Sequence, residues 1–274
     1  MDTARDIQYS SLPYIRSEME HEYGENVHIL SSPVLMTLLA KLCAKGTIQP
    51  EANRLIAELY MDMLKVVVNA EFPRSEAVVP SRMIEQTPRG VYVGEVVSAR
   101  AKVAVAAVAR AGILPSQVVF DGLNLLLNPE HVREDCFFVS RAVDAEHRVT
   151  GANVASSKIG GPLDDRLLLL PDPMGATGSS LLQTLDTYVE NKVGKPRKAI
   201  AMHLIVTPEY LRNVTHRRPE IIVYAIRLDR GLSSPDVLAT KPGTRWEEER
   251  GLNEVHYIVP GGGGLGEVMT NSWV

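Results

Sequence analysis

Several features that would place this sequence in a specialised class are absent or scarce. Its 274 residues contain two cysteines, Cys43 and Cys136, which stand far apart and lack the spacing of a zinc or redox motif. No apolar run reaches the ~18 residues of a membrane span. The first residues lack the basic and apolar parts of a signal peptide. A net charge of −4 argues against a general nucleic-acid or membrane-surface binder. These absences predict a globular protein of the reducing cytoplasm, without a nucleic-acid or membrane partner.

From residue 102 onward the chain alternates strand and helix patterns. Predicted strands cover 103–108, 136–140, 167–170, 198–206, 221–228 and 256–259. Predicted helices cover 116–127, 180–191 and 208–216. This alternation predicts an α/β fold with a mostly parallel sheet flanked by helices.

The first part of the chain is organised differently. Residues 1–27 are polar and mixed in charge, and we interpret them as an N-terminal arm or part of a dimer contact, preceding a domain over 28–274. Apolar residues at helical spacing predict helices at 34–44 and 50–70. Several prolines and a glycine lead us to expect irregular structure over 71–95.

One segment carries most of the functional information. The apolar strand 167–170 runs into an acid and a loop of small residues, and a helix follows. Open α/β sheets bind their ligands at the carboxyl ends of strands. Uncovered backbone N–H groups at a helix N-terminus bind anions. The sequence therefore predicts a phosphate cradle in which the acid accepts hydrogen bonds from sugar hydroxyls, made of Asp172, Pro173, Met174, Gly175, Ala176, Thr177, Gly178, Ser179 and Ser180.

This run resembles the phosphoribosyl-diphosphate (PRPP) loop of type I phosphoribosyltransferases. Its Asp-Pro-Met-x-Ala-Thr-Gly-x-Ser form is similar to that of the uracil phosphoribosyltransferase family, which usually has Leu in place of Gly175 and Gly in place of Ser179. The resemblance covers about residues 28–267. It implies the type I phosphoribosyltransferase fold, a mostly parallel sheet flanked by helices with a C-terminal hood at about 229–274.

The resemblance also implies ligands for the pyrophosphate. Arg110 lies in an Arg-Ala-Gly turn that matches the pyrophosphate-binding turn of the family, and Arg141 matches a second anion ligand. Lys158 stands where relatives often have a lysine in a mobile loop, although a solvated lysine fits that position equally well. We interpret residues 142–162 as a long hairpin or a mobile loop that could close over the substrate.

Near the C-terminus, Arg250–Glu267 resembles the uracil-binding segment of the family. Backbone groups of a glycine-rich strand edge can pair with a pyrimidine dione, and glycines permit its close approach. The resemblance assigns the uracil contacts to Tyr257, Ile258, Gly266 and Glu267. Three glycines, Gly262–Gly264, lengthen the hood, and Glu267 replaces an Asp. About residues 232–250 are inserted between pieces that are nearly continuous in relatives, and we interpret the glutamates at 247–249 as a solvated part of that insertion.

Taken together, the resemblance implies transfer of ribose 5-phosphate from PRPP to uracil, giving UMP and pyrophosphate. Asp172 and Arg110 would be the catalytic residues. Mg²⁺ would be the cofactor, brought in by PRPP, and Asp172 would bind the ribose hydroxyls directly or through Mg²⁺-bound water. A homodimer or higher homo-oligomer is expected. Two alternatives stay open, which are a homologue that binds PRPP or UMP as a sensor without turnover, and a transferase for a different base.

Two other patterns in the sequence do not indicate a functional site. Gly261-x-Gly263-x-x-Gly266 fits a dinucleotide-binding fingerprint, but too few residues follow it to form the required helix and strand. The seven histidines show no metal-ligand spacing, and each is expected to be structural or exposed.

Overall fold

The computed structural model describes residue 11, residues 13–143 and residues 149–273, with only the backbone described between 140 and 152. The central sheet is parallel except for its last pair, β5 and β6. Its strands lie in the order β1 (Val27–Ile29), β10 (Ile221–Leu228), β9 (Lys198–Val206), β7 (Arg166–Pro171), β4 (Lys102–Ala109), β5 (Val132–Val143) and β6 (Val149–Lys158). A short strand, β8 (Met174–Gly175), adds to the carboxyl end of β9. The predicted strands at 198–206 and 221–228 are confirmed as β9 and β10.

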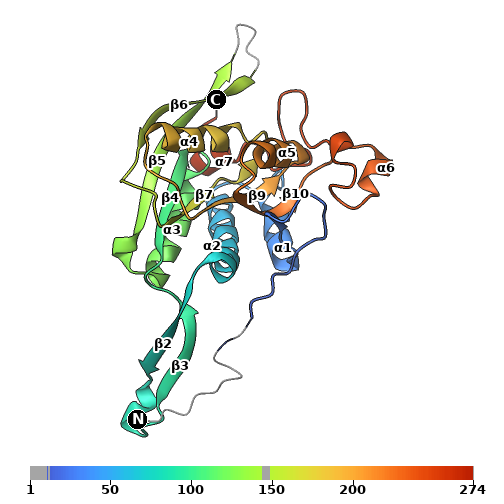
Figure 1. Cartoon of the computed structure of the whole chain (residues 1–274). Coiled ribbons are helices and arrows are strands. Elements are labelled where there is room, and N and C mark those ends of the chain that lie inside the picture. The colour runs from blue at the N-terminus through green and yellow to red at the C-terminus, as the bar shows by residue number, and fades with distance from the viewer. Residues whose placement is uncertain (1–10, 12, 144–148, 274) are drawn as a thin grey trace.

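Helices cover both faces of this sheet (Figure 1). One face packs against α1 (Pro33–Leu42), α2 (Glu51–Glu71), α3 (Ile113–Leu126) and α7 (Leu265–Thr270). The other packs against α4 (Ser179–Glu190) and α5 (Pro208–Arg217). Successive residues of β4 serve the two cores in turn, since Val103 and Val105 lie on the α2 side and Ala104 and Ala106 on the α4 side. Strands buried on both faces are continuous apolar runs, which is why the sequence showed them clearly.

Residues 71–95 are not irregular as expected. They form a two-stranded antiparallel ribbon of β2 (Arg74–Pro80) and β3 (Val91–Val97), joined through a short 3₁₀ turn at Arg82–Glu85. The ribbon projects away from the sheet (Figure 1). The ribbon contacts the core at Val97, at the end of β3, whereas Val78 stays 62% exposed. A ribbon that is largely exposed has little apolar–polar alternation, so the sequence pattern did not predict it.

Residues 142–162 belong largely to the β5–β6 pair, which confirms the hairpin interpretation. Its tip at 144–148 lies outside the described residues. Among the helices that the structure describes, none combines the length and apolar character that crossing a bilayer requires.

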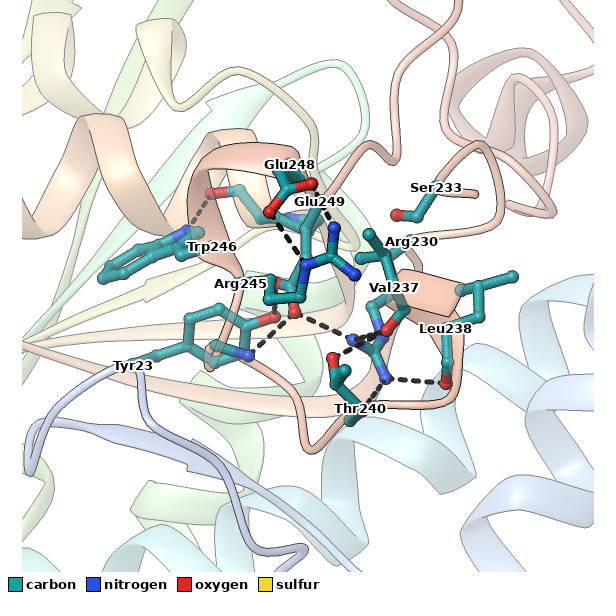
Figure 2. A network of polar contacts seen from close by, with 12 residues as sticks. Tyr23, Arg230, Ser233, Val237, Leu238, Thr240, Arg245, Trp246, Glu248 and Glu249 are labelled. Atoms are coloured by element: carbon teal, nitrogen blue, oxygen red, sulfur yellow. Dashed lines mark hydrogen bonds and ion pairs between the residues drawn. The ribbon is translucent and has the colours of Figure 1, made fainter. Parts of the chain in front are cut away.

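The insertion at 232–250 is folded against the rest of the chain. It contains a short helix, α6 (Pro235–Leu238), and a 3₁₀ turn at Trp246–Glu248. Glu249 at its end has no exposed surface, so the expectation that this glutamate is solvated was wrong. The buried carboxylate accepts hydrogen bonds from Arg230 Nη1 (2.8 Å), from the Gly243 N–H (2.8 Å) and from the Tyr23 hydroxyl (Figure 2).

Glu249 thereby joins three segments that are far apart in the sequence. Tyr23 comes from the stretch before β1, Arg230 follows β10, and Gly243 lies within the insertion. Arg230 also donates to the carbonyl of Thr240 (2.7 Å), so the guanidinium spans the base of the insertion (Figure 2). Since an unpaired buried charge is costly, both members of the Glu249–Arg230 pair are needed to hold the insertion in place.

Glu249→Ala is expected to lower the free energy of unfolding by about 3–5 kcal/mol, because Arg230 is left buried without its carboxylate. Denaturant unfolding followed by fluorescence measures this loss, since Trp246 packs edge-on against Tyr23 with ring centroids 4.9 Å apart. Glu248→Ala is the matched control. Its carboxylate is an exposed partner of Arg245, and its removal should change the stability little. Equal losses in the two variants would contradict the role given to Glu249.

Candidate functional site

The predicted cradle lies where β7 ends. The chain leaves β7 at Pro171, passes Asp172, pairs through β8 with the end of β9, and enters α4 at Ser179. A pocket of about 240 Å³ opens here at the carboxyl edge of the sheet. The loop supplies most of its lining, and the rest comes from Val108, Ala111, Leu170, Leu181, His203, Tyr210 and His256.

The carbonyl groups of the loop turn away from this pocket and are held by the N-cap of α5 and by a residue in the middle of that helix. Thr207 donates through its N–H to the Gly175 carbonyl (3.1 Å) and through its hydroxyl to the Ala176 carbonyl (2.7 Å). The side-chain amide of Asn213 donates to the Thr177 carbonyl (2.7 Å). Three consecutive carbonyls are therefore satisfied from behind the loop.

The N–H groups of the same loop are left for a ligand. Within the described residues, the N–H groups of Thr177, Gly178 and Ser180 have no hydrogen-bond partner. The hydroxyls of Thr177 and Ser179 lie 3.0 Å apart beside them, at the N-terminus of α4. Free N–H groups at the positive end of a helix dipole form a binding site for one phosphate group.

Two glycines of the loop are required by the side chains beneath it. A Cβ on Gly175 would lie 2.9 Å from Val206 Cγ1 and 3.2 Å from the Tyr210 ring, which leaves no room for the Leu that relatives carry. Gly178 has a φ of +81°, and a Cβ there would lie 2.7 Å from Val214 Cγ2. The departure at Gly175 therefore follows from the packing of Tyr210 under the loop.

Asp172 sits at the inner edge of the cradle. Its backbone N–H donates to the Met202 carbonyl, and its carboxylate accepts the Met174 N–H, both at 3.0 Å. Burial raises the pKa of Asp172 from its ordinary value of 3.8 to about 6, and the bond from Met174 offsets part of that rise. At pH 7 the carboxylate is ionised, with lone pairs left to accept further hydrogen bonds.

A buried histidine adjoins this acid and was not identified from the sequence. His203 is 1% exposed, with Nδ1 2.6 Å from the Asp172 carbonyl and Nε2 2.5 Å from the Tyr210 hydroxyl. Burial lowers the pKa of His203 to about 4, so the ring is neutral at pH 7. Nδ1 therefore donates to Asp172 and Nε2 accepts from Tyr210. The available signal was a single polar residue inside the apolar run of β9.

The two predicted pyrophosphate ligands and the predicted loop lysine lie on or next to three different strands. Arg110 follows β4 with an exposed side chain, and its Nη1 donates to the Ser272 carbonyl (3.0 Å). The backbone of Arg141 lies in β5, and its side chain is outside the described residues. Lys158 ends β6 opposite Cys136, and its side chain is exposed.

The predicted base segment is a turn and not the expected strand at 256–259. His256 has a φ of +63°, which interrupts an extended backbone, and only Ile258 pairs, with Leu252. Ile258 is buried in the core, whereas Tyr257 is 43% exposed. The Tyr257 N–H donates to Asn253 Oδ1 (2.8 Å). The pocket is reached instead by His256, which had not been assigned a role.

Gly266 and Glu267 lie in α7, beside the turn that carries Arg110. A Cβ on Gly266 would be 3.7 Å from that of Ala111. The contact from Arg110 to Ser272 joins the same two segments. The structure thus brings the predicted base segment, the Arg110 turn and the phosphate cradle to one edge of the sheet, while the insertion lies beside them (Figure 1).

The sequence profile of the uracil phosphoribosyltransferase family matches residues 29–244. The chain belongs to this family. A curated relative, the uracil phosphoribosyltransferase of Pyrococcus furiosus, is 28% identical over 98 residues. That match covers 33% of this chain and 41% of the relative, so the chain spans less than half of the relative's length.

A solved structure shares the fold over most of its length. The AQ2163 protein of Aquifex aeolicus is 18% identical, with a TM-score of 0.66, over 90% of this chain and 99% of that one. The adenine phosphoribosyl transferase of Trypanosoma brucei, solved with AMP, pyrophosphate and ribose-5-phosphate, is 13% identical, with a TM-score of 0.47, over 83% and 95% of the two chains. Likeness at this level carries no information on the base. The predicted family and the mostly parallel sheet flanked by helices are confirmed.

The raised pKa of Asp172 predicts how stability depends on pH. Between about pH 4 and 6 the unfolded chain releases this proton while the native state keeps it, so the group lowers the stability of the fold as pH rises. Above about pH 6 the loss is complete. Asp172→Asn lacks this titration. Its stability relative to the wild type should therefore rise between pH 4 and 7, by up to about 3 kcal/mol for a shift from 3.8 to about 6.

Denaturant unfolding at a series of pH values measures this difference. Asp164→Asn is the control, because Asp164 is exposed and its carboxylate accepts the Lys195 N–H at 3.3 Å, with no other partner in the described part of the chain. A stability difference between Asp172→Asn and the wild type that stays constant from pH 4 to 7 would show that the pKa of Asp172 is not raised.

Proposed function

We propose that this chain transfers the ribose 5-phosphate of PRPP to uracil, giving UMP and pyrophosphate. The observation that carries this proposal is the cradle itself. Three N–H groups without a partner among the described residues, together with two hydroxyls, line a pocket whose inner edge holds an ionised carboxylate. A bound phosphate would need the N–H and hydroxyl donors, and a sugar diol beside it would need the carboxylate as an acceptor.

In the proposed reaction, the loop N–H groups bind the 5-phosphate and Asp172 accepts hydrogen bonds from the ribose hydroxyls. A carboxylate there also favours the positive charge that develops on the ribose ring as the bond from C1′ to pyrophosphate breaks. The base nitrogen then bonds to C1′ and releases its proton. Catalysis of this kind depends mainly on holding the two substrates in line.

Arg110 is proposed to stabilise the departing pyrophosphate. One of its N–H donors is used by the Ser272 carbonyl, and within the described residues the others have no partner. A guanidinium carries five donors, so an anchored Arg110 keeps enough of them for a phosphate oxygen. Arg141 is proposed as the second cation, since its place in β5 lies beyond Phe138, the partner of Ala109 at the end of β4.

Mg²⁺ is proposed as the cofactor. In the described part of the chain, no group of three or more His, Cys, Asp or Glu residues could hold a metal ion. Mg²⁺ in phosphate-binding enzymes is commonly held by one or two carboxylates together with substrate phosphates and water. A single carboxylate, Asp172, fits that pattern. Bound there with the diphosphate, the ion would neutralise part of its charge.

Uracil is proposed to bind where the turn at 252–258 approaches the pocket. The ring of His256 already reaches the pocket, and Gly266 in α7 faces the Arg110 turn. The proposed contacts of the base remain Tyr257, Ile258, Gly266 and Glu267, with backbone groups reading the pyrimidine edge. Binding through backbone N–H and C=O groups would reject cytosine, because its changed donor pattern leaves buried groups unpaired.

A second candidate function is binding of PRPP or UMP without turnover. It is favoured by the exposure of Tyr257 and by the replacement of the family's Asp with Glu267, which together alter the base side of the site. A transferase that acts on another base is the third possibility. Both share the phosphate cradle and differ from the first proposal only in the base segment.

The deciding assay measures UMP formation from uracil and PRPP with Mg²⁺, with the other nucleobases tested in parallel. Asp172→Asn is expected to lower kcat/KM by about a hundredfold or more, because the neutral amide cannot stabilise the developing positive charge. Glu190→Gln, at the exposed end of α4, is the control and should keep wild-type activity. Turnover by another base alone would reassign the substrate. Tight PRPP binding without any turnover would make the chain a sensor.

A homo-oligomer in the cytoplasm is also proposed. Both cysteines are free, as in a reducing compartment. The exposed apolar side chains Val78 and Val79 on the β2–β3 ribbon support association with a second copy. Sedimentation velocity is expected to show a dimer or larger species that Val79→Lys shifts toward the monomer. A monomeric wild type would refute the oligomer without affecting the proposed reaction.

A further inference from the structure

The first turn of α5 holds the base segment through a single carboxylate. Both oxygens of Glu209 accept the Gly251 N–H, at 2.9 and 3.1 Å, and one also accepts the Leu252 N–H at 3.3 Å. Gly251 lies so close to the start of the helix that a Cβ there would be 3.0 Å from Thr207 Cβ. The segment that leads to Ile258 therefore starts in contact with the N-terminal end of α5.

The same helix holds the phosphate cradle through different side chains. Thr207 and Asn213 satisfy the carbonyls of Ala176 and Thr177, and the Tyr210 ring packs under Gly175. Residues 207, 210 and 213 recur every three positions and so lie along one side of the helix. Glu209 projects from another side, toward the base segment.

The inserted segment holds α5 in place from outside. Trp246 Nε1 donates to the Pro208 carbonyl (2.9 Å), Arg212 donates to the Trp246 carbonyl, and the Arg212 guanidinium lies 3.3 Å from the Glu247 carboxylate. In Figure 1 the helix lies between α4 and the insertion. A helix held on both sides can transmit a fixed geometry between the two loops that it contacts.

We propose, on the basis of the function proposed above, that α5 sets the distance between the phosphate cradle and the base segment, with Glu209 as the positioning residue for the base. Glu209 touches neither substrate. It fixes the Gly251 and Leu252 amides, and through them the turn that carries His256 and Tyr257. Asn213 has the same positioning role for the 5-phosphate. It fixes the carbonyl of Thr177 and so keeps the N–H groups of the loop directed toward the pocket.

Paired substitutions test this division of labour. Glu209→Ala is expected to raise KM for uracil about tenfold and to leave KM for PRPP within twofold, because two amides lose a charged acceptor. Asn213→Ala is expected to raise KM for PRPP about tenfold and to leave KM for uracil within twofold. Glu209→Gln, which keeps one acceptor oxygen, should fall between Glu209→Ala and the wild type. Glu220→Ala, exposed at the end of the α5–β10 connection, is the control.

Hydrogen exchange supplies a readout that needs no turnover. Amides in 250–259 should exchange faster in Glu209→Ala while those in 172–182 keep their wild-type rates, and Asn213→Ala should show the reverse. If the wild type turns over no base but this crossed pattern is found, the proposed reaction fails and the role of α5 stands. Both regions loosening together in both variants, or neither changing, would overturn it. Should Glu209→Ala fail to fold, the same comparison is made with Glu209→Gln.

Discussion

A phosphate site made of backbone N–H groups depends on what satisfies the carbonyl groups of the same loop. Turning the amide protons toward a ligand turns the carbonyls into the protein, where each needs a donor. In this chain the donors are the Thr207 amide and hydroxyl and the Asn213 side chain. The cradle is therefore a joint product of the loop after β7 and of the helix after β9, and neither would form the site alone.

That dependence explains the unusual composition of the loop. Tyr210 must reach His203 to satisfy a buried hydroxyl, and its ring then fills the space under Gly175. A larger side chain at Gly175 would push the loop away from Thr207 and uncouple the carbonyls from their donors. Gly175 in the loop and Tyr210 in α5 therefore depend on each other. Relatives place Leu where this chain has Gly175.

The sequence was sufficient where local pattern and local structure coincide. The apolar strands β7, β9 and β10 and the small-residue loop after β7 could all be predicted, because strands buried on both faces are continuous apolar runs and an anion loop requires small residues. The ribbon β2–β3 could not, since most of its side chains are exposed. Glu249 could not either. Three consecutive glutamates indicate a solvated stretch, and the burial of the third depends on Tyr23, 226 residues away.

The residues that position the site were hidden for a related reason. Thr207, Pro208 and Glu209 are a recognisable helix start, with a Thr N-cap, a Pro in the first turn and an acid near the positive end of the dipole. A helix start alone accounts for these three residue types. The sequence therefore does not indicate that Glu209 also accepts the Gly251 N–H or that the Thr207 hydroxyl donates to the Ala176 carbonyl. Side chains that serve both a helix terminus and a distant loop can be found only once the loop is in place.

Charged side chains are distributed differently inside the pocket and just outside it. Among the described residues that line it, none is Lys or Arg, and His203 is neutral at pH 7. In the proposed function the attraction for a phosphate there would come from backbone dipoles, which fix the geometry of one anion without adding net charge. In the proposed reaction the charge of the diphosphate would be met outside the pocket, where the Ser272 carbonyl holds Arg110. Because that anchor is in the C-terminal segment, the residues after α7 help to fix the position of the Arg110 side chain.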